Sequence, residues 1–287
     1  MSQESEIHPL AIVEPGAQLG KGVKIEPFAI VKQHVTLEDG VQIKAHAYID
    51  GYTTIGEETV VWPGAAIGTK SQDLKYRGEK TFVSIGKRCE IREYATINSS
   101  CQENTTVRVG DDCLIMAYCH VAHNCELGNH VVMSNGAMLA GHVTVGDYAR
   151  IGGMTPIHQF VRVGCHAMVG GFSGILRDIP PYTIGGGVPY RFGGINLVGL
   201  KRNHFSLEVR IAISKAFKLT FRSGLHLEEA LSTIEREVPL YPEIQHWLEF
   251  CRSSKRGVAS LEGAVKQEAP EEETLLEAVY AEKNSKV

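Results

Sequence analysis

Residues 109–151 read VGDDCLIMAYCHVAHNCELGNHVVMSNGAMLAGHVTVGDYARI. In this stretch every sixth residue is a large aliphatic side chain or a methionine: Val109, Ile115, Val121, Leu127, Met133, Leu139, Val145 and Ile151. The same phase continues outward to Ile7 and to Ile175, and it survives two interruptions, at 69–84 and 98–108. A period of six residues is neither that of an α-helix nor that of an alternating strand.

A second register lies four residues after the first and is filled by small side chains. It includes Ala11, Ala17, Ala29, Ala47, Ala65, Ala95, Ala137, Ala149 and Ala167, and the cysteines Cys89, Cys113, Cys119 and Cys125. We interpret these cysteines as small apolar core residues and not as metal ligands or redox groups. Together the two registers resemble the hexapeptide repeat of the left-handed parallel β-helix, in which three hexads form a coil of roughly 18 residues. Successive coils of such a fold stack about 4.8 Å apart.

The repeat also predicts how the chain is divided. It ends near Pro180-Pro181, so residues 1–190 are expected to form the β-helix. The two interruptions should loop outward, as insertions in solenoids do, often on the binding face. A small helical domain is predicted over 191–256, and 257–287 form an acidic tail that is either disordered or a loosely attached helix.

Capping residues place the helices of the second domain. Ser206 is a predicted N-cap with Glu208 in the first turn, and Gly224 is a predicted stop. Two further helices are expected at about 227–238 and 242–254.

The composition excludes several classes of protein. A net charge of −4 gives no global sign of nucleic-acid binding. The seven cysteines form no disulfide framework, which is typical of a reducing cytoplasm. The first six residues lack the basic and apolar regions of a signal peptide, and no apolar run approaches the roughly 20 residues of a membrane-spanning helix. We therefore expect a cytoplasmic protein without integral membrane contact.

Histidines gather in the second half of the repeat, at His120, His123, His130, His142, His158 and His166. Stepping one coil of about 18 residues from His123 leads to Gly141-His142, and a second step leads to His158-Gln159. These residues should therefore share one edge of three successive coils and form a compact polar site. A metal-dependent hydratase of the same fold shows a His-x4-His pair, and no two histidines here are five apart. No metal and no cofactor are expected.

The segments HVAHNC (120–125), LAGH (139–142) and GGMTPIHQF (152–160) closely resemble UDP-N-acetylglucosamine O-acyltransferase, the family that performs the first step of lipid A synthesis. The loop QDLKY (72–76), the run MVGGFSG (168–174), and Asn196 with GLKR (199–202) match the family as well. The resemblance extends from about residue 7 to 256. It implies transfer of a fatty acyl group from acyl carrier protein to the 3-hydroxyl of UDP-N-acetylglucosamine.

The resemblance also implies roles for individual residues. His123 would be the general base and the Gly141 N–H would stabilise the oxyanion. His120, His142, His158, Gln159 and Asn196 would line the sugar-nucleotide site, with Asp73 and Lys75 from the loop, and Arg202 would bind the diphosphate. The family is a homotrimer with sites between subunits.

Four further positions bear on the substrate: Gly171 matches a family position that contacts the acyl chain, and three other residues differ from those usual in the family. Gly171 matches the position that limits acyl length, and a glycine there leaves room for a chain of about fourteen carbons. Asn124 stands where an aspartate usually orients the catalytic histidine, Val198 replaces a glutamate, and Asn203 replaces an arginine. These departures bear on nucleotide contacts and on whether the acyl chain carries a 3-hydroxyl.

Basic side chains concentrate between residues 191 and 222. They are Arg191, Lys201, Arg202, Arg210, Lys215, Lys218 and Arg222, against a single acidic Glu208. Such a surface would steer an acidic partner, and acyl carrier proteins are small and acidic.

Two alternatives remain at this point. One is an N-acyl variant that acts on a 3-amino sugar nucleotide, and another is a binding solenoid without catalysis or with a metal. The N-acyltransferase that acts later in the pathway carries a uridine-binding domain before its β-helix, for which a repeat that begins at Ile7 leaves no room.

Overall fold

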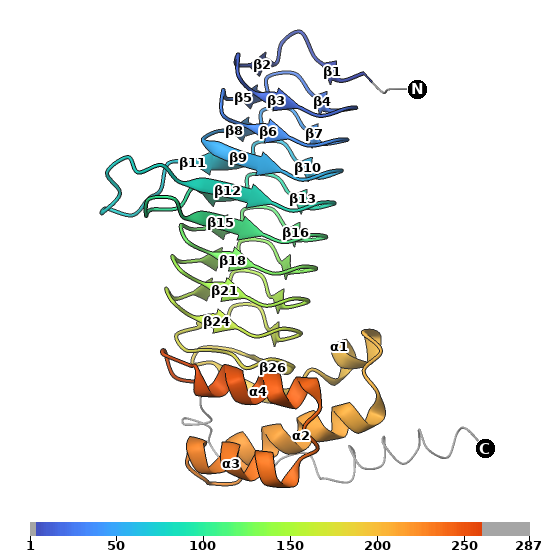
Figure 1. The fold of residues 1–287 in the computed structure, drawn as a ribbon, viewed down its shortest axis with the longest axis vertical. Coiled ribbons are helices and arrows are strands. Elements are labelled where there is room, and N and C mark those ends of the chain that lie inside the picture. The colour runs from blue at the N-terminus through green and yellow to red at the C-terminus, as the bar shows by residue number, and fades with distance from the viewer. Residues whose placement is uncertain (1–3, 260–287) are drawn as a thin grey trace, which may run out of the picture.

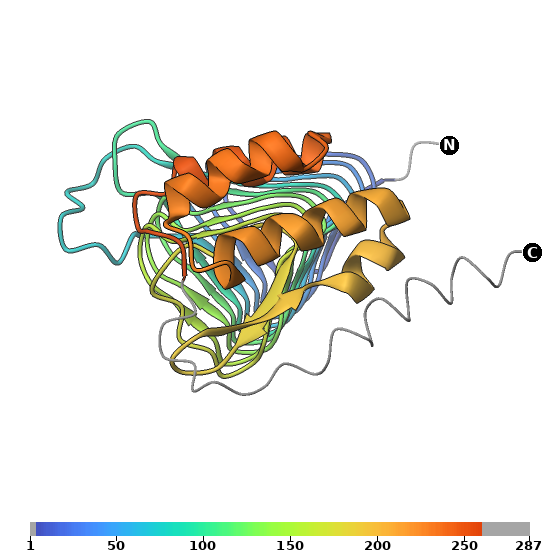
Figure 2. The ribbon, with the colours of Figure 1, turned by 90° about the horizontal axis from the view of Figure 1, so that it is seen from below.

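The computed structural model describes residues 4–259, which form a tall triangular solenoid closed at one end by helices (Figure 1). The predicted tail, 257–287, lies almost wholly outside the described residues. Short strands stack into three parallel sheets, one on each side of the triangle, as Figure 2 shows along the axis. The fold is the left-handed parallel β-helix that the repeat predicted.

The strands are assigned to three sheets, here named A, B and C. Sheet A contains β1 (Glu6–Ile7), β4 (Lys24–Ile25), β7 (Gln42–Ile43), β10 (Val60–Val61), β13 (Glu90–Ile91), β16 (Leu114–Ile115), β19 (Val132–Met133), β22 (Arg150–Ile151), β25 (Met168–Val169), β26 (Thr183–Gly186) and β27 (Arg191–Ile195). Sheet B contains β2 (Ile12–Val13), β5 (Ile30–Val31), β8 (Tyr48–Ile49), β11 (Ala66–Thr69), β14 (Thr96–Asn98), β17 (His120–Val121), β20 (Met138–Leu139) and β23 (Pro156–Ile157). Sheet C contains β3 (Gln18–Leu19), β6 (Thr36–Leu37), β9 (Tyr52–Ile55), β12 (Phe82–Ile85), β15 (Thr106–Val109), β18 (Glu126–Leu127), β21 (Thr144–Val145) and β24 (Arg162–Val163).

The core follows the two registers of the sequence. The aliphatic residue of each hexad ends its strand and points inward, so that Ile115 and Met133 are fully buried and pair in register, one coil apart. The small residue lies at the next bend, and the four cysteines of this register are buried free thiols, as predicted. Small side chains suit this position because the three walls converge there.

The two interruptions of the repeat leave the solenoid at the same corner. One loop, 70–81, connects β11 to β12, and the other, 99–105, connects β14 to β15. Both therefore join sheet B to sheet C at what we call the BC corner, and Figure 2 shows them projecting together. The two remaining corners are named AB and CA. The coil after the second loop carries His123 at its own BC corner.

The second domain contains four helices: α1 (Leu197–Arg202), α2 (Leu207–Arg222), α3 (Leu227–Glu237) and α4 (Pro242–Arg252). The Ser206 side chain accepts a hydrogen bond from the Val209 N–H and caps α2, and Gly224 follows that helix with a positive φ, as predicted. The expected helices at 227–238 and 242–254 are also confirmed.

The start of this domain differs from the sequence prediction. Residues 191–195 form β27, which pairs antiparallel with β26 and extends sheet A beyond residue 190. The short helix α1 was not anticipated either, because six residues are too few to show a helical period. Arg162 of β24 fastens the solenoid to α4 through hydrogen bonds to the Phe250 carbonyl and the Ser253 hydroxyl.

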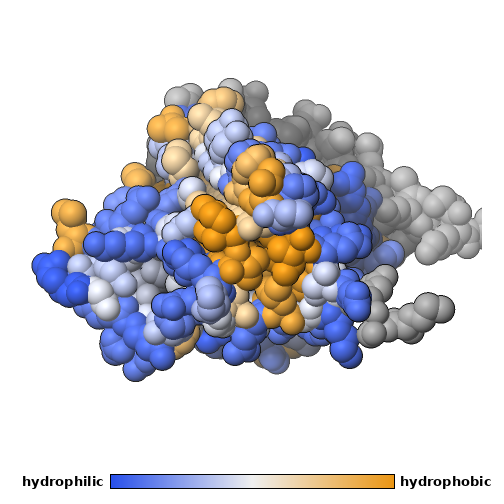
Figure 3. Space-filling view, turned by 90° about the horizontal axis from the view of Figure 1, so that it is seen from above, coloured by the Kyte–Doolittle hydropathy of each residue, from blue (hydrophilic) through white to orange (hydrophobic). Residues whose placement is uncertain are grey.

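The other end of the solenoid has no covering helix among the described residues. Figure 3 shows an apolar patch there, where the first coil leaves Ile7, Leu10 and Ile12 exposed. None of the helices in residues 4–259 has the length and apolar character to cross a bilayer.

Candidate active site

His123 lies at the BC corner directly after β17 and is partly buried. Its Nδ1 is 3.1 Å from Oδ1 of Asn124. The Asn124 amide is oriented by two other groups: the Cys101 N–H donates to its Oδ1, and its own Nδ2 donates to the Thr105 hydroxyl. Because Oδ1 can only accept, His123 carries its proton on Nδ1 and presents the lone pair of Nε2.

Asp73 faces that free nitrogen from the first loop. Its Oδ2 is 3.8 Å from Nε2 of His123. The Lys75 N–H donates to the Asp73 carboxylate at 2.8 Å, and this hydrogen bond is the main reason why the pKa of Asp73 lies below its usual value. The loop therefore places a negative charge beside the imidazole, where it can stabilise a proton that Nε2 has received.

Gly141 lies one coil below His123, as the coil arithmetic predicted. The imidazole ring occupies the space that a Cβ at residue 141 would need, so any larger residue would displace it. The His123 carbonyl accepts a hydrogen bond from the His142 N–H, and the Gly141 carbonyl accepts one from the Phe160 N–H. Within residues 4–259, however, the N–H of Gly141 itself donates to no acceptor. A stretch of backbone with a free donor thus lies against the imidazole ring.

The remaining predicted histidines line the same edge. His142 meets the His123 ring edge-on at 5.2 Å between centroids and stacks on Phe160 at 4.5 Å. His120 lies on the outer face of sheet B, with Nδ1 2.7 Å from the Thr96 hydroxyl. Burial, helped by His123, lowers the pKa of both His120 and His142, so both are neutral near pH 7.

His158 and Gln159 complete the edge two coils below His123, and both are exposed. Arg256 donates to Nδ1 of His158 at 3.1 Å and to the Leu176 carbonyl. The same Nδ1 also lies 3.2 Å from the Gln159 carbonyl, which can only accept, so each of the two tautomers of His158 satisfies one of these contacts. Arg256 was not among the predicted site residues, because its contact joins segments 98 positions apart.

A pocket of about 510 Å³ lies between the two loops and this edge. It is lined by Asp73, Lys75, Glu79, Cys101, Gln102, Glu103, His142 and Phe160. Cys101 is a site residue that the sequence reasoning missed. The available signal was its position: Cys101 keeps the phase of the small register, six residues after Ala95, but it lies in the second interruption of the repeat and is therefore a loop residue.

Three of the predicted site residues do not join His123 within one chain. Asn196 caps α1 through its Oδ1, and its Nδ2 donates to the carbonyl of His166 at the CA corner. Arg202 is exposed at the end of the same helix, and Asn203 caps it by donating to the Gly199 carbonyl. Gly171 lies at the AB corner, across sheet B from the BC corner.

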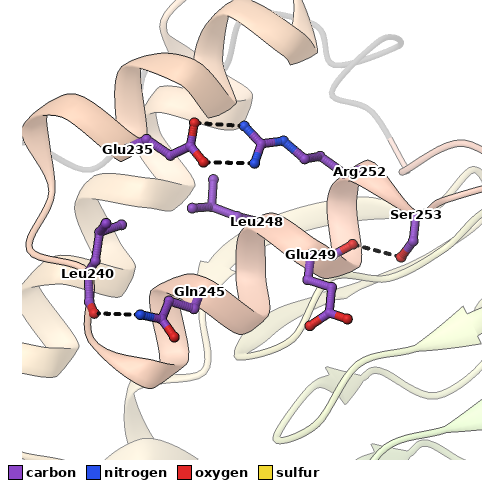
Figure 4. A pocket seen from close by; sticks show the side chains of 7 residues that line it. All are labelled: Glu235, Leu240, Gln245, Leu248, Glu249, Arg252 and Ser253. Carbon is purple, nitrogen blue, oxygen red and sulfur yellow. Dashed lines mark hydrogen bonds and ion pairs between the residues drawn. The ribbon is translucent and has the colours of Figure 1, made fainter.

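A second pocket, of about 520 Å³, lies against α4 in the helical domain (Figure 4). Its rim is formed by paired groups, above all the two hydrogen bonds between Arg252 and Glu235, and it lacks the base and free donor found beside His123. The pocket at the BC corner is therefore the better candidate of the two.

Residues 178–259 match the model described as UDP-N-acetylglucosamine O-acyltransferase, domain 2, and residues 106–141 match that of the bacterial transferase hexapeptide repeats. An acyl-(acyl-carrier-protein)–UDP-N-acetylglucosamine O-acyltransferase of Chlamydia abortus is 56% identical over 97% of this chain and 99% of its own length. The protein of the same name from Chlamydia pneumoniae is 56% identical over 94% of this chain and 96% of its own length.

Solved structures agree with these relatives. A UDP-N-acetylglucosamine acyltransferase of Bacteroides fragilis superposes with a TM-score of 0.86 at 39% identity, over 88% of this chain and 99% of that one. Its counterpart from Campylobacter jejuni gives a TM-score of 0.84 at 41% identity, over 89% and 99% of the two chains.

Proposed function

Because this chain belongs to the family of UDP-N-acetylglucosamine O-acyltransferases, we propose a direct acyl transfer in which His123 is the general base. The chain is an enzyme that moves a fatty acyl group from acyl carrier protein to UDP-N-acetylglucosamine, the first step of lipid A synthesis. The N-acyl alternative is not favoured, since the relatives are O-acyltransferases.

In the proposed reaction, Nε2 of His123 takes the proton of the sugar 3-hydroxyl as its oxygen attacks the thioester carbonyl. The Gly141 N–H donates to the oxyanion of the tetrahedral intermediate. Collapse of the intermediate forms the ester and expels the carrier thiolate, which recovers the proton from His123. The Asp73 charge, 3.8 Å away, stabilises the imidazolium between these steps.

The observation that carries the proposal is the hydrogen bond between Nδ1 of His123 and Oδ1 of Asn124. It fixes the tautomer in which Nε2 can accept a proton, and a Cβ at residue 141 would clash with the same nitrogen, so the Gly141 backbone is close to it. In the proposal the base and the Gly141 N–H act on the same reacting carbonyl, as acyl transfer requires.

The other residues of the edge are proposed to bind the acceptor. Lys75, His120, His142, His158 and Gln159 surround His123 at distances that a sugar nucleotide can span, and the neutral histidines supply hydrogen bonds without opposing a proton on the base. No cofactor takes part in this scheme.

We also propose that the enzyme is a homotrimer whose sites lie between subunits. Asn196 and Arg202 are held at the CA corner of their own chain, away from His123 at the BC corner. They can contact the same nucleotide only if the CA corner of one chain faces the BC corner of another. Two different corners that meet in this way make a head-to-tail contact, which closes into a ring.

The acyl chain is proposed to run from His123 across sheet B to the AB corner. Met138 on this face and Met154 and Phe172 at the corner are exposed apolar side chains. Gly171 lies beside Phe172 and leaves the end of this path open. We therefore propose a long acyl chain, of about fourteen carbons, since pocket shape sets the preference.

Acyl carrier protein is proposed to dock on the basic surface of 191–222. Arg191, Lys201, Arg202, Lys215, Lys218 and Arg222 are all exposed there. Lys215 pairs with Glu237, and the seven basic side chains of 191–222 still outnumber the single acidic Glu208 of this segment. The free thiols of all seven cysteines support our proposal that the protein works in the cytoplasm.

The test is an acyl-transfer assay with UDP-N-acetylglucosamine and carrier-protein thioesters of increasing chain length. The native enzyme should favour a chain of about fourteen carbons, and His123→Ala should lower kcat by a factor of about 100 or more. His46→Ala, an exposed position at the AB corner of an early coil, is the matched control for loss of a histidine. Equal rates for native enzyme and His123→Ala would contradict the role of His123.

A further inference from the structure

The BC corner brings together a set of side chains that general-base catalysis does not need. The Sγ of Cys101, a ring nitrogen of His123 and a ring nitrogen of His142 all lie within 4.8 Å of one another. They come from loop 99–105 and from two successive coils, so the fold and not the chain order assembles them. Asp73 adds a carboxylate oxygen 3.8 Å from Nε2 of His123.

Thiolate, imidazole and carboxylate are the ligands that Zn²⁺ prefers in proteins. In a tetrahedral zinc site, ligand atoms lie roughly 3.3–3.8 Å apart, because each bond is about 2.0–2.3 Å long. The Asp73–His123 distance is already at this limit, and the ligand atoms of Cys101, His123 and His142 need to approach one another by about 1 Å. The Asp73 carboxylate is not part of this group of three and joins it by a movement of its own loop. Cys101 belongs to a loop outside the stacked coils, so a small shift of that loop disturbs no sheet hydrogen bond.

The surroundings of these side chains also resemble those of a metal site. A histidine that binds a metal usually donates its second N–H to a fixed acceptor, which orients the ring. Here Nδ1 of His123 donates to Asn124, and the Cys101 N–H and the Thr105 hydroxyl hold that amide in place. His142 is held from the other side by stacking on Phe160. The donors are therefore positioned before any ion arrives.

We propose that the enzyme binds one Zn²⁺ per chain through Cys101, His123, His142 and Asp73, and that this ion inhibits acyl transfer. The ion occupies Nε2 of His123, so the lone pair that accepts the substrate proton is no longer available. Binding releases the Cys101 thiol proton to solvent, so the affinity for Zn²⁺ increases with pH. The inhibition rests on the proposed role of His123, but the binding of the ion does not.

Binding is tested with Co²⁺, which replaces Zn²⁺ in such sites and absorbs visible light. Titration of the native protein should give a thiolate-to-cobalt charge-transfer band and the intense bands of a tetrahedral ion, saturating at one equivalent. Cys101→Ser should lose the charge-transfer band, whereas Cys165→Ser, a partly exposed cysteine outside the cluster, should keep it. Thermal unfolding of each variant shows whether it is folded. A native spectrum without the charge-transfer band would overturn the proposal, whether or not the protein transfers acyl groups.

Inhibition is measured separately, with each variant compared with its own metal-free rate. Zn²⁺ should inhibit the native enzyme, and a chelator should restore the rate. Cys101→Ser should need at least about tenfold more Zn²⁺ for the same inhibition. Loss of a residue that only hydrogen-bonds to a metal ligand already lowers metal affinity by about this factor, and Cys101 is a proposed ligand itself. Equal sensitivity of Cys101→Ser and native enzyme would show that zinc acts elsewhere and would overturn the inhibitory role.

Discussion

At the scale of single residues, Asn124 decides how the candidate base works. Its amide oxygen accepts from His123, from the Cys101 N–H and from the Cys101 thiol, 3.0 Å away. An aspartate at this position would accept the same bonds and add a full negative charge. The amide therefore orients His123 by hydrogen bonding alone, and the only carboxylate beside the ring within the described residues is that of Asp73, 3.8 Å from Nε2.

Replacing Asn124 with aspartate should move the acidic limb of the kcat/KM profile to higher pH by about one unit. The added charge stabilises the imidazolium, so His123 stays protonated, and inactive as a base, up to a higher pH. The measurement is the pH dependence of kcat/KM for acyl transfer. Gln33→Glu makes the same amide-to-carboxylate change at the BC corner near the N-terminus and should leave the profile unshifted. A shift to lower pH in Asn124→Asp would contradict the hydrogen bond to Nδ1.

At the scale of elements, the corners are formed by residues in a conformation that side chains usually avoid. The second turn residue of most corners has a positive φ, for example His130, Tyr148 and His166 at the CA corner. This conformation costs a residue with a side chain about 1 kcal/mol. The rings of successive coils offset the cost by stacking: Tyr148 lies 4.4 Å from His130 and 4.8 Å from His166 between centroids.

Because stacking offsets the strain of a positive φ, glycine should be a better replacement for Tyr148 than alanine. Both Tyr148→Ala and Tyr148→Gly lose the stacking, but only glycine relieves the strain, so the glycine variant should be more stable by about 1 kcal/mol. Denaturant unfolding of the two variants measures the difference. At Thr144, an exposed position in strand β21, the order should be reversed, so that Thr144→Ala is more stable than Thr144→Gly. An alanine variant at 148 as stable as the glycine variant would show that the strain is negligible.

At the scale of the whole molecule, the solenoid distributes one candidate site over different corners. His123 and the two loops are at the BC corner, whereas Asn196 and Arg202 are at the CA corner, fixed by α1. A straight solenoid is too stiff to bring two of its own corners together. The proposed reaction therefore depends on assembly, and an isolated chain should lack part of its nucleotide site.

Subunit mixing tests this dependence. His123→Ala and Arg202→Ala chains should each be nearly inactive alone. Trimers assembled from an equal mixture should recover about a quarter of the native activity, because a site is complete when it takes His123 from one type of chain and Arg202 from the other. Mixing His123→Ala with Gly141→Ala, which affect the same corner, should recover none. Absence of recovery in the first mixture would mean that both groups act within one chain.

The sequence by itself determined the β-helix and the alignment of the candidate site. Core residues repeat every six positions, so pairing one coil apart follows from counting, and Ile115 pairs with Met133 as counting requires. The same arithmetic placed Gly141-His142 and His158-Gln159 below His123. The capping residues located α2 for a similar reason, because a cap acts on its own neighbours in the chain.

Tertiary structure alone decided what the two loops add and which residues remain apart. Loops 70–81 and 99–105 have no period, so nothing in their order showed that Asp73 faces Nε2 or that Cys101 joins His123 and His142. The separation of Arg202 from His123 was likewise invisible, because it depends on how α1 folds back onto the CA corner. A repeat specifies its own contacts because they recur at a fixed interval along the chain, whereas contacts between a loop or a terminal helix and the solenoid form at intervals that no local pattern records.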